Sequence, residues 1–234
     1  MPTFRTLNQA FFKTWSPDMA YVLGYFAADG CMIANARNGH YIEFTSTDHV
    51  LLRLVQRVTC AHQTIRMRKR DTRNHGKWKQ TYRLQIGSNA WFGDLVKLGF
   101  STNKSKTLIF PDVPETYLGD FVRGYFDGDG CVYFTDLKYT GRSHKRWILM
   151  TLFTSGSREF LETLMLRLRP YNVKGGSFHQ KERGYDLRFS HRDSLALYVL
   201  MYNTAPISEL YLPRKREKLE RAIQVLGLDK VLRS

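Results

Sequence analysis

The sequence of 234 residues contains no run of about 18 apolar residues, so we expect no ordinary transmembrane helix and no membrane partner. Its first residues lack the apolar core and cleavage site of a secretory signal, which predicts an intracellular protein. Cysteine is scarce, and Cys31, Cys60 and Cys131 can neither all pair within the chain nor form a spaced metal motif. We therefore expect a reducing compartment and no zinc site.

Acidic residues are few relative to basic ones. The chain has 36 Lys and Arg against 21 Asp and Glu, a formal net charge of +15. A solvated surface does not require so one-sided a balance, and the charge is not concentrated on one amphipathic helix, as it is in many membrane-surface proteins. The composition therefore predicts a polyanionic partner, with nucleic acid favoured.

One segment of the chain occurs twice. Residues 21–31 read YVLGYFAADGC and residues 121–131 read FVRGYFDGDGC, so seven of the eleven positions are identical at an offset of 100 residues. Shorter echoes follow in the same order: 44–46 with 153–155, 82–84 with 185–187, and 108–111 with 210–213. The repeat predicts two similar halves, residues 1–110 and 116–234, joined by a proline-marked linker at 111–115.

Each half predicts the same succession of elements. Ser16, Pro17 and Asp18 have the pattern of a helix N-terminus, and residues 113–115 offer a similar start to the second half. Asn38-Gly39 is a hairpin signal. The expected strands are 31–36, 40–46, 65–70, 78–86, 131–138, 145–154, 176–180 and 185–190, and the expected later helices are 48–60, 89–98, 157–168 and 192–202. The prediction is an α+β fold, αββαββα twice, with two antiparallel four-stranded sheets.

Small residues recur on one face of each repeated helix. Gly24 and Ala28 lie four residues apart, as do Gly124 and Gly128. Because Gly inside a helix costs about 0.5–1 kcal/mol relative to Ala, its repeated use indicates a steric reason. The two helices are expected to pack closely across a pseudo-two-fold axis, although each glycine could instead pack on its own sheet.

Close packing would bring Asp29 and Asp129 together at the helix C-termini. Two carboxylates there repel each other and the carbonyl ends of the helix dipoles, unless a cation lies between them. Oxygen ligands favour Mg²⁺ or another hard divalent ion, which suits hydrolysis of a phosphodiester bond. The alternative is that both residues only form Asp-Gly turns.

These segments resemble the two motifs of the LAGLIDADG homing endonucleases in their single-chain, two-repeat form. The matching residues are Val22–Gly30 (VLGYFAADG) and Val122–Gly130 (VRGYFDGDG). The resemblance implies that the two sheets form a saddle over the major groove of DNA. It implies that Asp29 and Asp129 bind two or three Mg²⁺ ions, with the carbonyls of Gly30 and Gly130 as further ligands. Mn²⁺ is expected to substitute, and Ca²⁺ to support binding only.

The resemblance also implies a basic residue beside the metals. Lys104 is the candidate in the first half, with Lys106 as its rival. The comparable place in the second half is Ile207-Ser208, which has no Lys, so two unequal active sites are expected. Residues 214–221 (RKREKLER) indicate a solvated helix or a tail that contacts the DNA backbone.

Alternation along the expected hairpins gives candidates for DNA contact, because Arg and Gln read base edges and Lys more often contacts phosphate. Which strand parity faces the DNA stays open at this point, and each residue could instead be ordinary solvated surface. The candidates are Arg66, Arg68, Arg70, Arg83, Gln85, Lys138, Arg142, Lys145, Arg146, His179, Lys181 and Arg183.

The resemblance implies a monomeric, Mg²⁺-dependent double-strand DNA endonuclease. Its target would be a long, imperfectly palindromic duplex, cut to leave short 3′ overhangs. Two alternatives use the same scaffold: a maturase that binds the RNA of its host intron, and a DNA-binding regulator that does not cleave.

Overall fold

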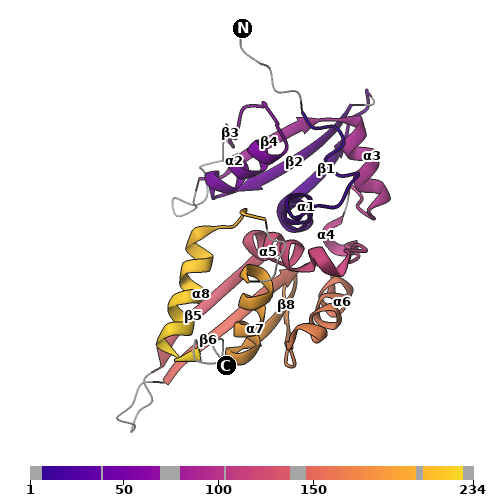
Figure 1. Cartoon of the computed structure of the whole chain (residues 1–234). Helices are drawn as coiled ribbons and strands as arrows, with labels where there is room; N and C mark the ends of the chain where they lie inside the picture. The colour runs from indigo at the N-terminus through magenta and orange to yellow at the C-terminus, as the bar shows by residue number, and fades with distance from the viewer. Residues whose placement is uncertain are drawn as a thin grey trace.

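A computed structural model describes residues 7–37, 39–68, 80–102, 104–137, 146–203 and 208–228. It has two halves, each built on one four-stranded antiparallel sheet, with helices α1 and α5 between them (Figure 1). None of the helices in these ranges is long and apolar enough to cross a membrane. The predicted α+β class is therefore confirmed.

The first half contains the expected αββαββα unit and one further short helix. Its strands lie in the order β1-β2-β4-β3. The elements are α1 (Pro17–Asp29), β1 (Gly30–Ala34), β2 (His40–Ser46), α2 (His49–Val58), β3 (Arg66–Met67), β4 (Tyr82–Gly87), α3 (Asn89–Lys97) and α4 (Lys104–Thr107).

The second half repeats the unit and also ends in a further helix. Its sheet has the matching order β5-β6-β8-β7. The elements are η1 (Glu115–Tyr117), α5 (Leu118–Asp129), β5 (Gly130–Leu137), β6 (Arg146–Ser155), α6 (Arg158–Leu168), η2 (Arg169–Tyr171), β7 (Ser177–Lys181), β8 (Gly184–Ser190), α7 (His191–Tyr202) and α8 (Pro213–Val225).

Serine caps explain where three of the helices begin. The Ser16 hydroxyl accepts a hydrogen bond from the Met19 amide at 3.1 Å, with Pro17 in the first helical position. Ser88 and Ser157 cap α3 and α6 in the same way. The second repeat helix differs from the expectation, because residues 115–117 form a 3₁₀ turn and α5 begins only at Leu118.

The two sheets share one register. Gly30 lies opposite Phe44 and Gly130 opposite Phe153, so each first strand pairs with its neighbour in the same way. Ser46 opposite Tyr82 matches Ser155 opposite Tyr185. This pairing agrees with the sequence echoes of 44–46 with 153–155 and of 82–84 with 185–187, and it extends them to the other strand residues near the centre.

Helices α1 and α5 touch backbone to backbone. A Cβ atom on Gly24 would overlap the carbonyl oxygen of Phe121, and one on Gly124 would overlap that of Tyr21. A Cβ atom on Gly128 would overlap that of Ala28. All four predicted small residues therefore lie at the contact between the helices, and their small size is what allows it.

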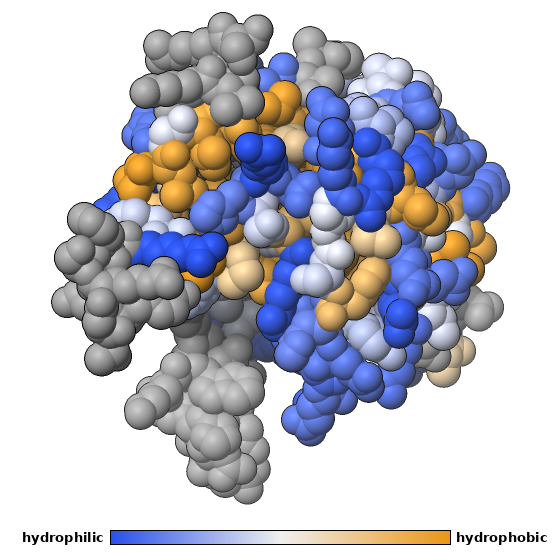
Figure 2. All heavy atoms as spheres, turned by 90° about the horizontal axis from the view of Figure 1, so that it is seen from below, coloured by the Kyte–Doolittle hydropathy of each residue, from blue (hydrophilic) through white to orange (hydrophobic). Residues whose placement is uncertain are grey.

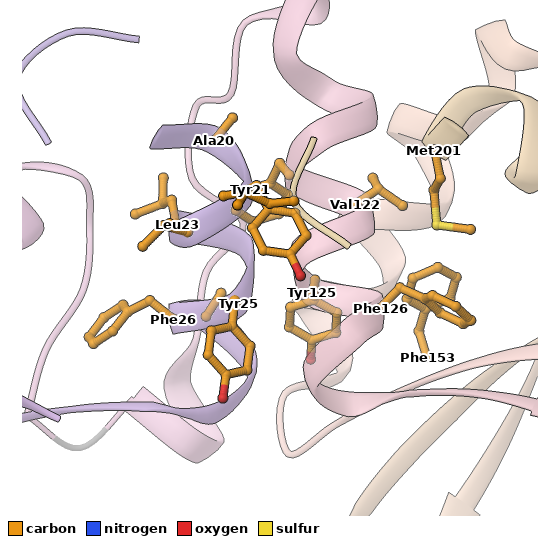
Figure 3. Close-up of a cluster of buried hydrophobic side chains, with 14 of the residues drawn as sticks. Ala20, Tyr21, Leu23, Tyr25, Phe26, Val122, Tyr125, Phe126, Phe153 and Met201 are labelled. Atoms are coloured by element: carbon orange, nitrogen blue, oxygen red, sulfur yellow. The ribbon is translucent and has the colours of Figure 1, made fainter. Parts of the chain in front are cut away.

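Buried aromatic side chains surround this contact. Tyr25 and Tyr125 lie on the facing helices, with both hydroxyls directed toward the same end of the pair (Figure 3). The Tyr25 hydroxyl donates to the Thr45 carbonyl at 3.4 Å, and the Tyr125 hydroxyl donates to the Thr154 carbonyl at 2.7 Å. The helix ends are thereby fixed to the second strand of each sheet.

Candidate active site

Asp29 and Asp129 are the last residues of α1 and α5, and both residues are half-buried. A Cβ atom on Gly128 would lie 3.4 Å from the Asp29 carboxylate, so Asp29 lies against the end of the other helix. Burial, and next the negative charge of Asp129, raise the pKa of Asp29 to about 7. Burial also raises the pKa of Asp129. The structure brings the two predicted acids into one electrostatic site.

Lys104 supplies a positive charge to this site from the start of α4. Its side chain is buried, and its Nζ donates to the Ala27 carbonyl at 2.6 Å. The same Nζ lies 5.5 Å from the centre of the Phe26 ring. Lys106 is exposed instead. The geometry favours Lys104 over its rival, because only Lys104 is directed to the end of a repeat helix.

The second half has its own lysine, contrary to the expectation drawn from Ile207-Ser208. Lys215 of α8 is buried, and its Nζ donates at 2.6 Å to the carbonyls of Phe126 and Gly130. It also donates to the Asp127 carbonyl at 2.9 Å and lies 5.2 Å from the centre of the Phe126 ring. Lys104 and Lys215 thus contact corresponding positions of the two repeats, so the second site has a basic residue too.

Sequence matching missed Lys215 because of chain order. Lys104 precedes its LIFP segment, whereas Lys215 follows the corresponding LYLP segment. A usable signal was present all the same. Lys215 shares the buried face of α8 with Leu219, Ala222 and Ile223, at helical spacing, so this helix is not simply solvated.

Burial lowers the pKa of both lysines to about 8, against the opposing effect of the nearby carboxylates. The carboxylates favour the charged lysines, and the lysines lower the pKa values of Asp29 and Asp129. The site therefore contains two acids and two bases, each shifted toward its neutral form by burial.

Asp127 occupies the sixth position of the second motif, where the first motif has Ala27. Its carboxylate accepts hydrogen bonds from the Tyr21 hydroxyl at 2.7 Å and the Leu212 amide at 2.8 Å. Burial raises its pKa to about 6. The residue joins α1, α5 and the segment before α8, and so helps to position Lys215.

The donor atoms at this site fit a hard divalent cation. The pKa values of the two half-buried carboxylates stay raised even beside Lys104 and Lys215, so a bound cation would favour their ionised forms. Mg²⁺ often binds through one or two carboxylates and completes its shell with water and substrate phosphate. Within the described ranges, no three His, Cys, Asp or Glu side chains gather where they could hold a metal ion. The Gly130 carbonyl already accepts a hydrogen bond from Lys215, so any ion there would share that oxygen.

Each sheet has an outer face, defined here as the face directed away from its own helices and core. In the first half, Arg66 pairs with Arg83 across β3 and β4, and Gln85 lies two residues farther along β4. Leu84 and Ile86 alternate with them and are buried. Arg66, Arg68, Arg83 and Gln85 therefore share the outer face of the first sheet.

In the second half, His179 and Lys181 lie on the outer face of β7. Buried Asp186 of β8 is bound there by Lys181 at 2.6 Å and by Arg188 at 3.2 Å. Arg188 is a basic outer-face residue that the sequence analysis did not single out. Arg146 begins β6, and Arg183 lies in the β7–β8 turn. The remaining candidates lie outside the described residues: Arg70, Lys138, Lys145 and Arg142.

Comparison with known proteins agrees with this geometry. Residues 16–94 match the family described as LAGLIDADG-like domain. Residues 16–94 thus contain a LAGLIDADG-like domain, and the chain as a whole has the two-repeat LAGLIDADG fold. Its structure resembles the LAGLIDADG meganuclease I-AabMI bound to uncleaved DNA, with a TM-score of 0.60 and 14% identity over 93% of this chain and 92% of that one. The homing endonuclease I-WcaI bound to its DNA recognition sequence gives 0.58 and 15% identity over 90% and 91%. At these identities the likeness shows the shared LAGLIDADG fold alone.

Two further similarities are to proteins that are not named as endonucleases. Full-length DUF199/WhiA from Thermatoga maritima has a TM-score of 0.54 and 13% identity over 93% of this chain and 64% of that one. A reverse gyrase from Methanocaldococcus jannaschii is 31% identical over 133 residues, which cover 54% of this chain and 8% of the gyrase. The chain thus spans a small part of the reverse gyrase. The fold also occurs in DUF199/WhiA, a protein that is not named as an endonuclease.

Proposed function

We propose that this chain is a divalent-metal-dependent endonuclease that cleaves double-stranded DNA as a monomer. The observation that carries the proposal is the pair of half-buried carboxylates, Asp29 and Asp129, where the two repeat helices end. A basic chain of net charge +15 is suited to a polyanionic substrate. The resemblance to DNA-bound meganucleases supports the same substrate.

Asp29 and Asp129 would hold two or three Mg²⁺ ions, with Mn²⁺ as a substitute and the carbonyls of Gly30 and Gly130 as added ligands. When bound, Mg²⁺ supplies positive charge to the phosphate and lowers the pKa of a bound water. Lys104 and Lys215 would orient the helix-end carbonyls and add positive charge beside the scissile phosphates. Because each half has one acid and one lysine, each would serve one DNA strand.

The outer faces of both sheets would contact the DNA duplex. Arg66, Arg68, Arg83 and Gln85 in the first half, and His179, Lys181 and Arg183 in the second, would contact bases and phosphates. Arg146 would contact the second half of the site, and Arg70, Lys138, Arg142 and Lys145 stay proposals from sequence. The target would be long and at most imperfectly palindromic, and cleavage would leave short 3′ overhangs.

The test begins with a randomised duplex library, selected for binding to the protein in Ca²⁺. Enriched duplexes are then incubated in Mg²⁺, in Mn²⁺ and in EDTA. We expect cleavage of both strands in Mg²⁺ or Mn²⁺ and none in EDTA. Asp29→Asn and Asp129→Asn should each abolish double-strand cleavage, whereas Asp112→Asn, at an exposed position, is the matched control and should cleave normally.

Other results would assign a different role. Tight binding in Ca²⁺ without cleavage in Mg²⁺ would favour a regulator. Preferential binding of a folded intron RNA over duplex DNA would favour a maturase. Full cleavage by both Asn variants would refute the proposed metal site even if the protein proved to be a nuclease.

A further inference from the structure

The outer face of the second sheet carries four apolar residues where a nucleic-acid surface is normally polar. Ile148, Met150 and Leu152 alternate along β6, and Tyr133 lies opposite Met150 on β5. We call these four residues the apolar strip. Alternation places them on the side opposite the buried Leu149, Thr151 and Phe153.

The apolar strip is separate from the hydrophobic core. Ile148, Met150 and Leu152 are half-buried, yet they belong neither to the core cluster nor to the partly buried side chains packed on it. Tyr133 is 44% exposed. Figure 2 shows the molecule from below the view of Figure 1. Much of this surface is hydrophilic, and its apolar side chains are gathered in patches. Apolar residues held together outside the core indicate a contact surface.

The first half carries only part of such a strip at the corresponding positions. Ile33 opposite Tyr41 corresponds to Tyr133 opposite Met150, but the charged Glu43 is the counterpart of Leu152. The neighbouring strand has Gln85 in the first half and Arg188 in the second. The two outer faces therefore differ in chemistry although their backbones correspond.

Basic residues border the apolar strip along the same face. Arg188 pairs with Leu152 on one side, and Arg146 lies two residues before Ile148 at the start of β6. A surface that is apolar in the middle and basic at its margins matches the major groove, where phosphates flank the base edges. The one apolar group on those edges is the methyl group of thymine.

We propose that the apolar strip reads thymine methyl groups in one half of the DNA target. The inference rests on the proposed function and adds the base preference of the second half. Residues two apart on a strand are about 6.8 Å apart, and base pairs are stacked about 3.4 Å apart. Ile148 to Leu152 would therefore span about four base-pair steps. Leu152 lies opposite Cys131, next to Gly130, so this window begins near the cleavage site and extends outward.

The test uses the enriched duplex from the library selection. Thymines in the window are replaced with deoxyuridine, which lacks only the methyl group, and binding is measured in Ca²⁺. Each methyl group removed should weaken binding about fourfold, from the value of one buried carbon. The same replacement beside Glu43 in the opposite half-site, where Leu152 has its polar counterpart, is the matched control and should change the dissociation constant less than twofold.

A protein variant completes the test. Met150→Gln keeps the side-chain length and removes its apolar end, so the thymine and deoxyuridine duplexes should bind with nearly equal affinity. Thermal unfolding of the variant, compared with that of the wild-type protein, tests whether the fold is retained. Leu152→Gln serves the same purpose if Met150→Gln unfolds.

The outcomes separate this inference from the proposed function. If the protein binds or cleaves the selected duplex but has the same affinity for its thymine and deoxyuridine forms, the apolar strip does not recognise thymine methyl groups. The nuclease proposal would then still stand. If the chain self-associates and Met150→Gln abolishes this self-association, the apolar strip is a protein–protein contact instead. A library that yields no bound duplex would overturn both proposals.

Discussion

Lys104 and Lys215 occupy matching places at the ends of the repeat helices, although one comes from α4 and the other from α8. Each is buried and points to the carbonyl of the sixth motif position. Lys106 and Lys218 lie nearby on the same two helices and are exposed. The chain thus offers a matched pair of buried and exposed lysines in each half.

We predict that Lys104→Met and Lys215→Met each slow the cleavage of one strand by about tenfold or more, because a charge beside the phosphate is lost. Nicked duplex should then accumulate before linear product. Lys106→Met and Lys218→Met are the controls and should cleave both strands at the normal rate. Strand-labelled duplexes resolved on denaturing gels measure both rates. Equal slowing of both strands by one variant would contradict the assignment of one lysine to one strand.

The raised pKa of Asp29, about 7, predicts the pH dependence of stability without metal. An unfolded Asp has a pKa of about 3.9, so between pH 4 and 7 the folded protein retains a proton that the unfolded chain has lost. The contribution of protonated Asp29 to the free energy of unfolding is therefore complete below pH 4, and it is lost as the pH rises through 7. In EDTA, the wild-type protein should lose more stability from pH 5 to pH 7.5 than Asp29→Asn does.

Mg²⁺ should reverse this trend, because it binds the ionised carboxylates. The rise in melting temperature on adding Mg²⁺ should grow as the pH increases through 7 in the wild-type protein and be much smaller in Asp29→Asn. Differential scanning fluorimetry at four pH values, with and without Mg²⁺, measures both effects. Parallel curves for the two proteins would show that Asp29 does not have the raised pKa.

At the scale of elements, the contact between α1 and α5 makes a prediction about stability. Gly24→Ala or Gly124→Ala would place a methyl group on a backbone carbonyl of the other helix, which can move only if the helices separate. We expect each to destabilise the protein by about 3 kcal/mol or more. A Cβ atom added to Gly93 of α3 would meet no neighbouring atom within 4 Å, so Gly93→Ala should instead stabilise the protein by about 0.5–1 kcal/mol. Urea denaturation measures all three variants.

Most elements could be predicted from the sequence because their signals are local. Ser16-Pro17 marked the start of α1, and the expected helix at 157–168 forms as α6 over Arg158–Leu168. The late start of α5 could not be predicted. Pro114 was compatible with helix, but residues 115–117 form a 3₁₀ turn, in which the Tyr117 ring stacks on Trp15. That contact joins residues about a hundred positions apart, so no local pattern reveals it.

At the scale of the whole molecule, a symmetric backbone carries asymmetric surfaces. Near the axis, Cys31 matches Cys131 and Thr45 matches Thr154. Farther out the counterparts diverge, and Arg83 corresponds to Asp186. The proposed target should therefore be symmetric, if at all, only around its centre.

This asymmetry predicts how the protein treats rearranged targets. Two palindromic duplexes, each made by duplicating one half of the selected target, should bind at least tenfold more weakly than the original. Each would present the wrong base edges to one sheet. Competition binding in Ca²⁺ at fixed salt measures the three affinities, since the salt concentration alone changes them. A palindrome that binds as well as the original target would contradict two independent reading surfaces.

The sequence by itself determined the two-fold repeat, the order of elements, and Asp29 and Asp129 as candidates, whereas Lys104 was implied by the family resemblance. The repeat, the order of elements and the two acids follow from spacing and periodicity, which are properties of neighbouring residues. Only the tertiary structure decided which strand parity faces outward, that Lys215 joins the second site, and that the apolar strip lies apart from the core. The reason is physical: strand register and the docking of α8 on α5 are set by packing between distant segments.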